Sequence, residues 1–247
     1  MACLSESAEV SVNRSFGTTH WSVICLAANV GSAGSLEAWQ RLAQSYWYPL
    51  YGFVRQAGHT EQDAKDLTQA FFAFLIERER LAGVIEGKGR FRSFLLTCLK
   101  NFLVSHHRKA KAAFRSPITP VLSLNELAAE ERFQLEGHKD SNPEVSYEKR
   151  WARSMVDESL SNVEAYYENG GQLRLFKELI AYLIEDGECV PYAELGQRLQ
   201  MTESAIRNAM YRLKRRLNLE FRAVVVATVP PDEVEDEIQH IHRVLTA

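Results

Sequence analysis

The stretch Tyr192–Leu219 constrains the fold most, because it predicts two amphipathic helices separated by a very short break. In the first helix, Leu195 and Leu199 fall on one face, and Gly196 is small enough to let a second helix approach closely. Thr202 suits the N-cap of the second helix. The apolar stripe of that second helix consists of Ile206, Met210, Leu213 and Leu217. The stretch therefore predicts a compact helical hairpin with a tight turn.

The other faces of the second helix are polar and basic. They carry Ser204, Arg207, Asn208, Tyr211, Arg212, Lys214, Arg215 and Arg216. A short helix, a tight turn and a longer basic helix are the parts of a helix-turn-helix, whose second helix contacts base edges near its N-terminus. Arg207 and Asn208 suit base edges, and the four later cations suit phosphates. The alternative interpretation is a buried helical hairpin with a solvated basic face.

Composition places the chain among soluble globular proteins. Its 247 residues are 46% hydrophobic and 25% charged, with a net charge of −3. A uniformly basic nucleic-acid binder is excluded, although local charge still decides where DNA is contacted. The four cysteines are far apart and form no CxxC pair, which disfavours a disulfide framework or a zinc site. No signal pattern or membrane-length apolar run is present, so we expect a cytoplasmic protein.

Helical periodicity recurs along the chain and no strand alternation rises above noise, which predicts an all-α fold of two small helical domains joined by an acidic linker. The expected units are a disordered N-terminus (1–17), a first helical domain (18–116), the linker (117–143), a second domain with the helix-turn-helix (144–222) and a C-terminal extension (223–247). The expected helices include 61–80, 91–113, 125–135, 144–168, 173–185 and 203–217, with a last one after Pro231.

Two further surfaces have an uneven charge. On the helix beginning near Glu61, the residues Asp63, Asp66 and Gln69 lie on one side, as a solvated face or as a surface for a basic partner. From Lys88 to Arg115 there are eight Lys or Arg residues and no acid, beside several aromatic residues. Such a segment suits phosphates and unstacked bases.

The last helix has acids in its first turn and an apolar stripe. The stripe consists of Val234, Ile238, Ile241 and Leu245. A helix this short is marginal alone, so we expect it to dock. It serves either as a brace on the second domain or as an inhibitory tail whose acids lie against a basic DNA-binding face, 207–216 or 100–111.

Three long segments together resemble the extracytoplasmic-function sigma factors of bacterial RNA polymerase. They are YWYPLYGFVRQAGHTEQDAKDLTQAFFAFL, GRFRSFLLTCLKNFLVSHHRKAK and YAELGQRLQMTESAIRNAMYRLKRRL. The strings TTHWSVI, YWYPLY and PPDEVEDEI are similar to a subgroup found chiefly in planctomycete-type bacteria. The resemblance implies a subunit that directs core RNA polymerase to promoter DNA and assists strand opening.

The resemblance also implies roles for individual residues. The −35 element is expected to bind Ser204, Arg207, Asn208, Tyr211, Arg212, Lys214 and Arg215. The −10 element falls to Lys88, Arg90, Arg92, Lys100, Asn101 and Arg108. Core polymerase is expected to bind Asp63, Asp66 and Gln69. An anti-sigma factor or another regulator is a possible further partner.

Two other functions compete with this one. A helix-turn-helix regulator acting without polymerase needs neither the acidic face nor the basic segment. An enzyme on RNA needs a catalytic constellation, and the chain has no HExxH, P-loop or GxSxG motif. We therefore expect no enzyme, no metal and no cofactor.

Overall fold

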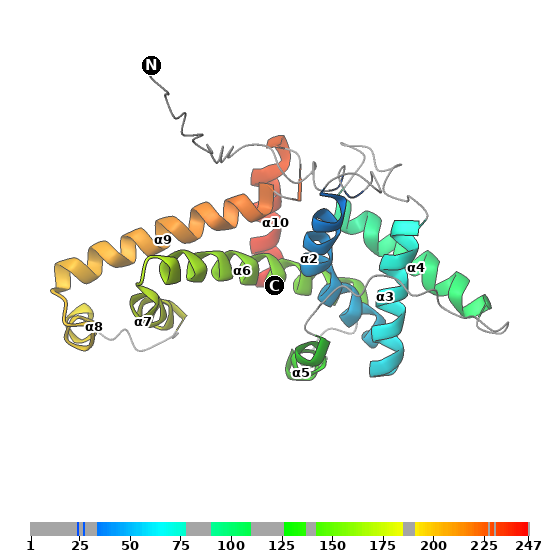
Figure 1. Ribbon diagram of the computed structural model, residues 1–247, viewed down its shortest axis with the longest axis horizontal. Helices are drawn as coiled ribbons and strands as arrows, with labels where there is room; N and C mark the ends of the chain where they lie inside the picture. The colour runs from blue at the N-terminus through cyan, green and yellow to red at the C-terminus, as the bar shows by residue number, and fades with distance from the viewer. Residues whose placement is uncertain are drawn as a thin grey trace, which may run out of the picture.

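The computed structural model describes residues 24, 27, 34–77, 90–109, 126–136, 142–184, 191–226, 228–229 and 231–246, and all regular structure within these ranges is helical (Figure 1). The all-α expectation is confirmed for them. The helices are α2 (Ser35–Gln56), α3 (Glu61–Glu77), α4 (Phe91–Lys109), α5 (Glu126–Glu136), α6 (Pro143–Asn169), α7 (Leu173–Ile184), α8 (Tyr192–Leu199), α9 (Glu203–Val226) and α10 (Val234–Thr246), with a 3₁₀ turn η2 (Pro231–Glu233) before the last. The expected disordered segment 1–17 lies outside the described residues.

Helices α6 and α9 form the long axis of the molecule. They lie side by side and antiparallel, with α7 and α8 at one end of the pair and α2 to α5 near the other (Figure 1). Asn142 caps α6 by accepting a hydrogen bond from the Glu144 N–H at 2.9 Å, and Pro143 occupies the first helical position, where its missing N–H costs nothing. This pair sets the distance between the two ends of the molecule.

Two apolar clusters lie along this pair, and both long helices contribute to each. At one end, Val163 and Tyr167 of α6 pack with Ile206 and Met210 of α9. At the other end, α6 and α9 pack with α2, α4 and α10; the shared buried residues include Trp39, Tyr46, Leu50, Phe91, Leu95, Tyr147, Trp151, Met155, Val224, Val225 and Ile241. The apolar core therefore continues across the boundary expected at residues 143 and 144.

Helix α9 is longer than the sequence predicts, since it ends at Val226 rather than Leu217. The extra turns exist because Val224 and Val225 are buried at 5% and 0% exposure in the larger cluster. Burial of such side chains stabilises the folded chain by roughly 1.5–3 kcal/mol each, before entropy losses. The expected boundary at residue 223 thus falls inside a helix.

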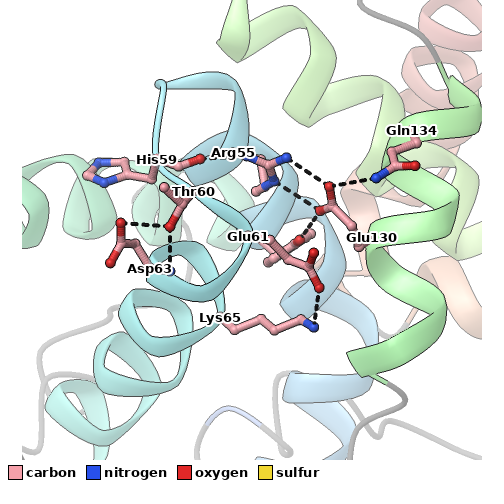
Figure 2. A network of polar contacts seen from close by, with 9 residues as sticks. Arg55, His59, Thr60, Glu61, Asp63, Lys65, Glu130 and Gln134 are labelled. Carbon is pink, nitrogen blue, oxygen red and sulfur yellow. Dashed lines mark hydrogen bonds and ion pairs between the residues drawn. The ribbon is translucent and has the colours of Figure 1, made fainter.

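Helix α5, which was expected inside the linker, docks on α2. Phe133 is 3% exposed and packs edge-on against Tyr51 at 6.4 Å between ring centroids. Glu130 accepts hydrogen bonds from Arg55 Nε at 2.9 Å and Arg55 Nη2 at 2.8 Å, and from Gln134 at 3.2 Å (Figure 2). The Tyr51 hydroxyl donates to the same carboxylate. A polar network therefore fixes a connecting segment to the first helices.

This network predicts an acid-sensitive contribution to stability. Hydrogen bonds from Arg55 lower the pKa of Glu130 from its ordinary 4.5 to about 2, against the opposing effect of burial. A depressed carboxyl pKa stabilises the fold above the unfolded value and loses that effect as the pH falls from about 4.5 toward 2. We predict that Glu130→Gln lowers the free energy of unfolding at neutral pH and that the deficit disappears across this window.

Urea denaturation at several pH values measures the effect. Asp157→Asn is the control, because that exposed carboxylate pairs only at the surface with Arg132. Parallel stability curves for the wild type and Glu130→Gln would show that the network makes no ionic contribution.

Candidate nucleic-acid interface

Helices α8 and α9 are joined by a turn of three residues held by backbone hydrogen bonds. Gln200 takes a left-handed conformation with φ 55°, and the Met201 N–H donates to the Gly196 carbonyl at 2.8 Å. Thr202 immediately precedes α9 and caps it. Its carbonyl accepts a hydrogen bond from the Ile206 N–H at 3.0 Å, and its hydroxyl oxygen accepts one from the Ala205 N–H at 3.3 Å. The sequence prediction of Thr202 as the N-cap is confirmed.

Gly196 permits the close approach of the two helices. A Cβ atom at this position would lie 2.6 Å from the Met201 carbonyl oxygen, which is closer than real Cβ contacts allow. It would also lie 3.7 Å from Ile206 Cγ1, an ordinary contact. The obstacle is backbone, which cannot rotate away as a flexible side chain can. The angle between α8 and α9 therefore requires glycine at position 196, because glycine has no Cβ atom.

The smaller apolar cluster holds this pair of helices against α6 and α7. Its buried members are Val163, Tyr167, Phe176, Leu179, Leu195, Ile206, Ala209, Met210 and Leu213. Its members from α9, which are Ile206, Ala209, Met210 and Leu213, lie on the inward face of that helix. The outward face is left to polar side chains, as the 3.6-residue period predicts.

All seven side chains predicted to contact the −35 element are exposed. They are Ser204, Arg207, Asn208, Tyr211, Arg212, Lys214 and Arg215. Tyr211, in the middle of this set, is 67% exposed, which is unusual for an aromatic side chain that has no external contact. The structure thus places the predicted residues together on the solvent side of α9.

The cations of α9 differ in how they are paired. Arg212, Lys214 and Arg215 form no ion pair with any described residue, whereas Arg207 Nη2 lies 2.7 Å from Glu203 Oε1 one turn earlier. That surface pair is weak, and a phosphate or base edge can displace it at a cost of about 0.3–0.5 kcal/mol. Three cations on one helix therefore lack a carboxylate partner in the part of the chain that the structure describes.

Arg216 differs from this set in its contacts. Its guanidinium lies 4.0 Å from the centroid of the Tyr166 ring and Nη2 lies 2.7 Å from Glu220 Oε1. A stacked and paired guanidinium packs the helix against α6. The role of Arg216 as a phosphate ligand stays a prediction beside this structural one.

The predicted −10 residues are arranged differently. Arg92 is 4% exposed, which contradicts a simple solvent-facing role: Nε lies 2.8 Å from Glu148 Oε2, and Nη1 pairs with Glu237. Its guanidinium also lies 4.3 Å from the Trp151 ring centroid. Arg90 pairs with the second oxygen of Glu237. Both arginines at the start of α4 are therefore occupied by carboxylates.

The rest of the basic segment is only partly described. Lys100 pairs with Glu144, and Asn101 is exposed on α4. Lys88 and the side chain of Arg108 lie outside the described residues. Arg92, Lys100 and Asn101 lie on α4, and Arg90 immediately precedes it. Of these four, only Asn101 has no carboxylate partner among the described residues.

Glu148 and His240 were not expected as partners of the basic segment. Glu237, an acid of the expected inhibitory turn, meets Arg90 and Arg92 rather than 207–216 or 100–111. His240 Nε2 lies 3.0 Å from Glu148 Oε2, so one carboxylate bridges α4 and α10. Burial raises the pKa of Glu237, and the nearby Arg92 and Arg90 oppose this effect without overcoming it. The only signal in the sequence was the match between an acid-rich segment at 232–237 and an acid-free one at 88–115.

The three residues predicted to bind polymerase are exposed on α3. Asp63 N–H donates to Thr60 Oγ1 at 3.2 Å and the Thr60 hydroxyl donates to Asp63 Oδ2 at 2.8 Å, so Thr60 caps the start of α3 (Figure 2). Asp66 Oδ1 accepts from Gln62 Nε2 at 3.1 Å, and Gln69 follows one turn later. They form an acidic surface beside the network around Glu130.

The described residues contain no group of three or more His, Cys, Asp or Glu side chains placed to hold a metal ion. None of their helices combines the length and apolar character that crossing a membrane requires.

Comparison with protein families, curated proteins and solved structures finds no match for this chain.

The turn between α8 and α9 predicts a specific defect. Gly196→Ala places a methyl group against the Met201 carbonyl, so we expect α8 and α9 to separate and stability to fall by about 1–3 kcal/mol. Thermal unfolding measures the loss. Gly170→Ala is the matched control, because a Cβ there meets its nearest atoms at 3.6 Å. An equal melting temperature for both variants would contradict the tight packing at Gly196.

Proposed function

We propose that the protein binds promoter DNA through α8 and α9, acting as a helix-turn-helix, and that it does so as a sigma-type specificity subunit of RNA polymerase. The observation that carries the proposal is the cluster of uncompensated cations, Arg212, Lys214 and Arg215, on the exposed face of a helix that also presents Asn208 and Tyr211. A solvated basic face needs no tight turn, no glycine at the crossing and no exposed aromatic at its centre.

The division of labour on α9 follows from position. Arg207 and Asn208 lie in its first two turns, where a recognition helix meets base edges. Arg212, Lys214 and Arg215 lie farther along, where the phosphate backbone crosses the groove. Specificity should therefore depend on the first pair and general affinity on the later three.

A regulator that works without polymerase is the second candidate. The exposed Asp63, Asp66 and Gln69 surface on α3 favours the sigma-type function, because a plain repressor or activator needs no acidic surface remote from its DNA-binding helix. The acid-free segment that begins at Lys88 favours it as well, since strand opening requires a second cationic surface. Reconstituted transcription with core polymerase on supercoiled promoter DNA distinguishes the two functions.

The recognition helix generates a prediction about DNA. We expect Arg207→Ala to cost about 1–3 kcal/mol on the cognate site and much less on random duplex. Arg215→Ala should weaken both duplexes alike and reduce the slope of log K against log salt by about 1. Fluorescence anisotropy across a salt series measures both. Equal losses on the two duplexes for Arg207→Ala would remove it from base recognition.

The α3 surface generates a prediction about polymerase. Asp66→Lys should reduce pull-down of core enzyme while duplex binding through α9 is unchanged, because it reverses charge far from α9 along the chain and exchanges only a hydrogen bond with Gln62. Glu168→Lys, an exposed reversal on α6, is the control for net charge. Unchanged assembly of Asp66→Lys with core enzyme would place the polymerase contact elsewhere.

A further inference from the structure

The last helix places a carboxylate between two arginines at the start of α4. Glu237 of α10 is 0% exposed, and its two oxygens pair separately with Arg90 and Arg92. Both arginines belong to the acid-free segment 88–115, and the structure describes both of their side chains. The contact joins residues that are far apart in the chain, so it cannot arise from local helix geometry.

A second contact from the same helix reinforces the first. His240, one turn after Glu237, lies 3.0 Å from the Glu148 carboxylate that also holds Arg92. The Arg92 guanidinium is thereby enclosed by Glu237, Glu148 and the Trp151 ring. Its Nε and Nη1 atoms are therefore held by carboxylates while α10 is docked.

The apolar side of α10 explains how the helix is held. Val234 and Ile241 are 3% and 1% exposed and belong to the larger cluster with α6 and α9. Leu245, at the end of the same helix, is 38% exposed. The apolar contacts of α10 therefore run from Val234 to Val244, and Leu245 lies largely outside them.

We propose that α10 is an autoinhibitory element whose Glu237 carboxylate occupies Arg90 and Arg92 and keeps them from the phosphates of single-stranded DNA until the helix is released. The inference rests on the proposed function, since it concerns the second cationic surface that strand opening requires. A guanidinium N–H donates to one acceptor at a time, so a carboxylate and a phosphate compete for it. The structure corresponds to the closed state.

The balance of forces at Glu237 fits a contact that can open. Burial has a larger effect on the pKa of this carboxyl than the attraction of Arg92 and Arg90, and the pKa rises. A buried ion pair whose desolvation exceeds its Coulombic attraction adds specificity of position rather than strength. Apolar packing at Val234 and Ile241 then remains as the main hold on the helix.

Two release variants test the proposal by separate routes. Glu237→Gln removes the charge with little change in shape, and Ile241→Ala loosens the anchor without touching a charge. We expect each to raise the affinity of the full chain for fluorescein-labelled oligothymidylate roughly tenfold at low salt. Two new phosphate contacts on a single strand should also steepen the log–log salt dependence by about 1.4.

Matched controls lie on the same helix. Glu235→Gln removes an exposed acid that pairs with Arg222, and Leu245→Ala shortens the exposed apolar residue. Neither should change oligothymidylate binding. Adding Arg90→Gln to either release variant should remove much of its gain, whereas Arg90→Gln alone should have little effect because Glu237 already occupies that arginine.

The opposite result is equally clear. If both release variants lower the melting temperature and neither gains affinity for oligothymidylate, α10 is a structural brace and the proposal is overturned. A gain that is unaffected by Arg90→Gln overturns it too, because the new phosphate contacts then lie elsewhere. Duplex binding through α9 is measured in the same proteins. Its absence would overturn the proposed function, whereas its presence without a gain on single strands would overturn only the inhibition.

Discussion

The burial of the Arg92 guanidinium is the constraint on which the arrangement of helices depends. An arginine cannot lose its charge, so at 4% exposure it requires carboxylates and an aromatic face around it. Those groups come from other helices: Glu148 and Trp151 from α6, and Glu237 from α10. Removing one partner while Arg92 stays buried costs about 3–5 kcal/mol, because it leaves an uncompensated buried charge. The start of α4 can therefore be enclosed only when α6 and α10 are both in place.

Helices α6 and α9 carry this constraint to the other end of the molecule. Each is continuous from the larger apolar cluster to the smaller one, and a helix of 24 residues such as α9 is about 36 Å long. The exposed cations of α9 therefore sit on a helix whose last turns, with Val224 and Val225, are buried beside α2 and α10. Helix α10 packs against the C-terminal end of α9, the helix that presents Arg207 and Asn208 near its N-terminus. The two charged surfaces are thus connected by a stiff element rather than by a flexible linker.

Local signals predicted local structure well. The N-cap at Thr202 and the close helix approach at Gly196 have short-range causes in the sequence, and the structure has both as expected. The sequence did not predict which charged side chains would form contacts within the fold. Arg212 and Arg216 look alike in sequence, yet one is free of ion pairs among the described residues and the other stacks on Tyr166. Which arginine meets a tyrosine depends on how α6 crosses α9, and helix periodicity alone does not fix that register. The burial of Arg92 was missed for the same reason.

The net charge of −3 does not show which cations could bind DNA. The contacts of each cation do, because they distinguish cations that hold the fold together from cations that face solvent. Arg55 and Arg150 are half-buried and buried, respectively, and each has a carboxylate at 2.8 Å. Such cations fix the packing of helices, and an external anion would have to displace a desolvated partner to reach them. Arg212, Lys214 and Arg215 meet no such competitor, so an approaching phosphate gains the full attraction. Arg90 lies between these cases: its side chain is 29% exposed and its only described partner is on the last helix. Its availability is therefore decided by the docking of α10, which makes the C-terminal helix the element that sets how much cationic surface the protein presents.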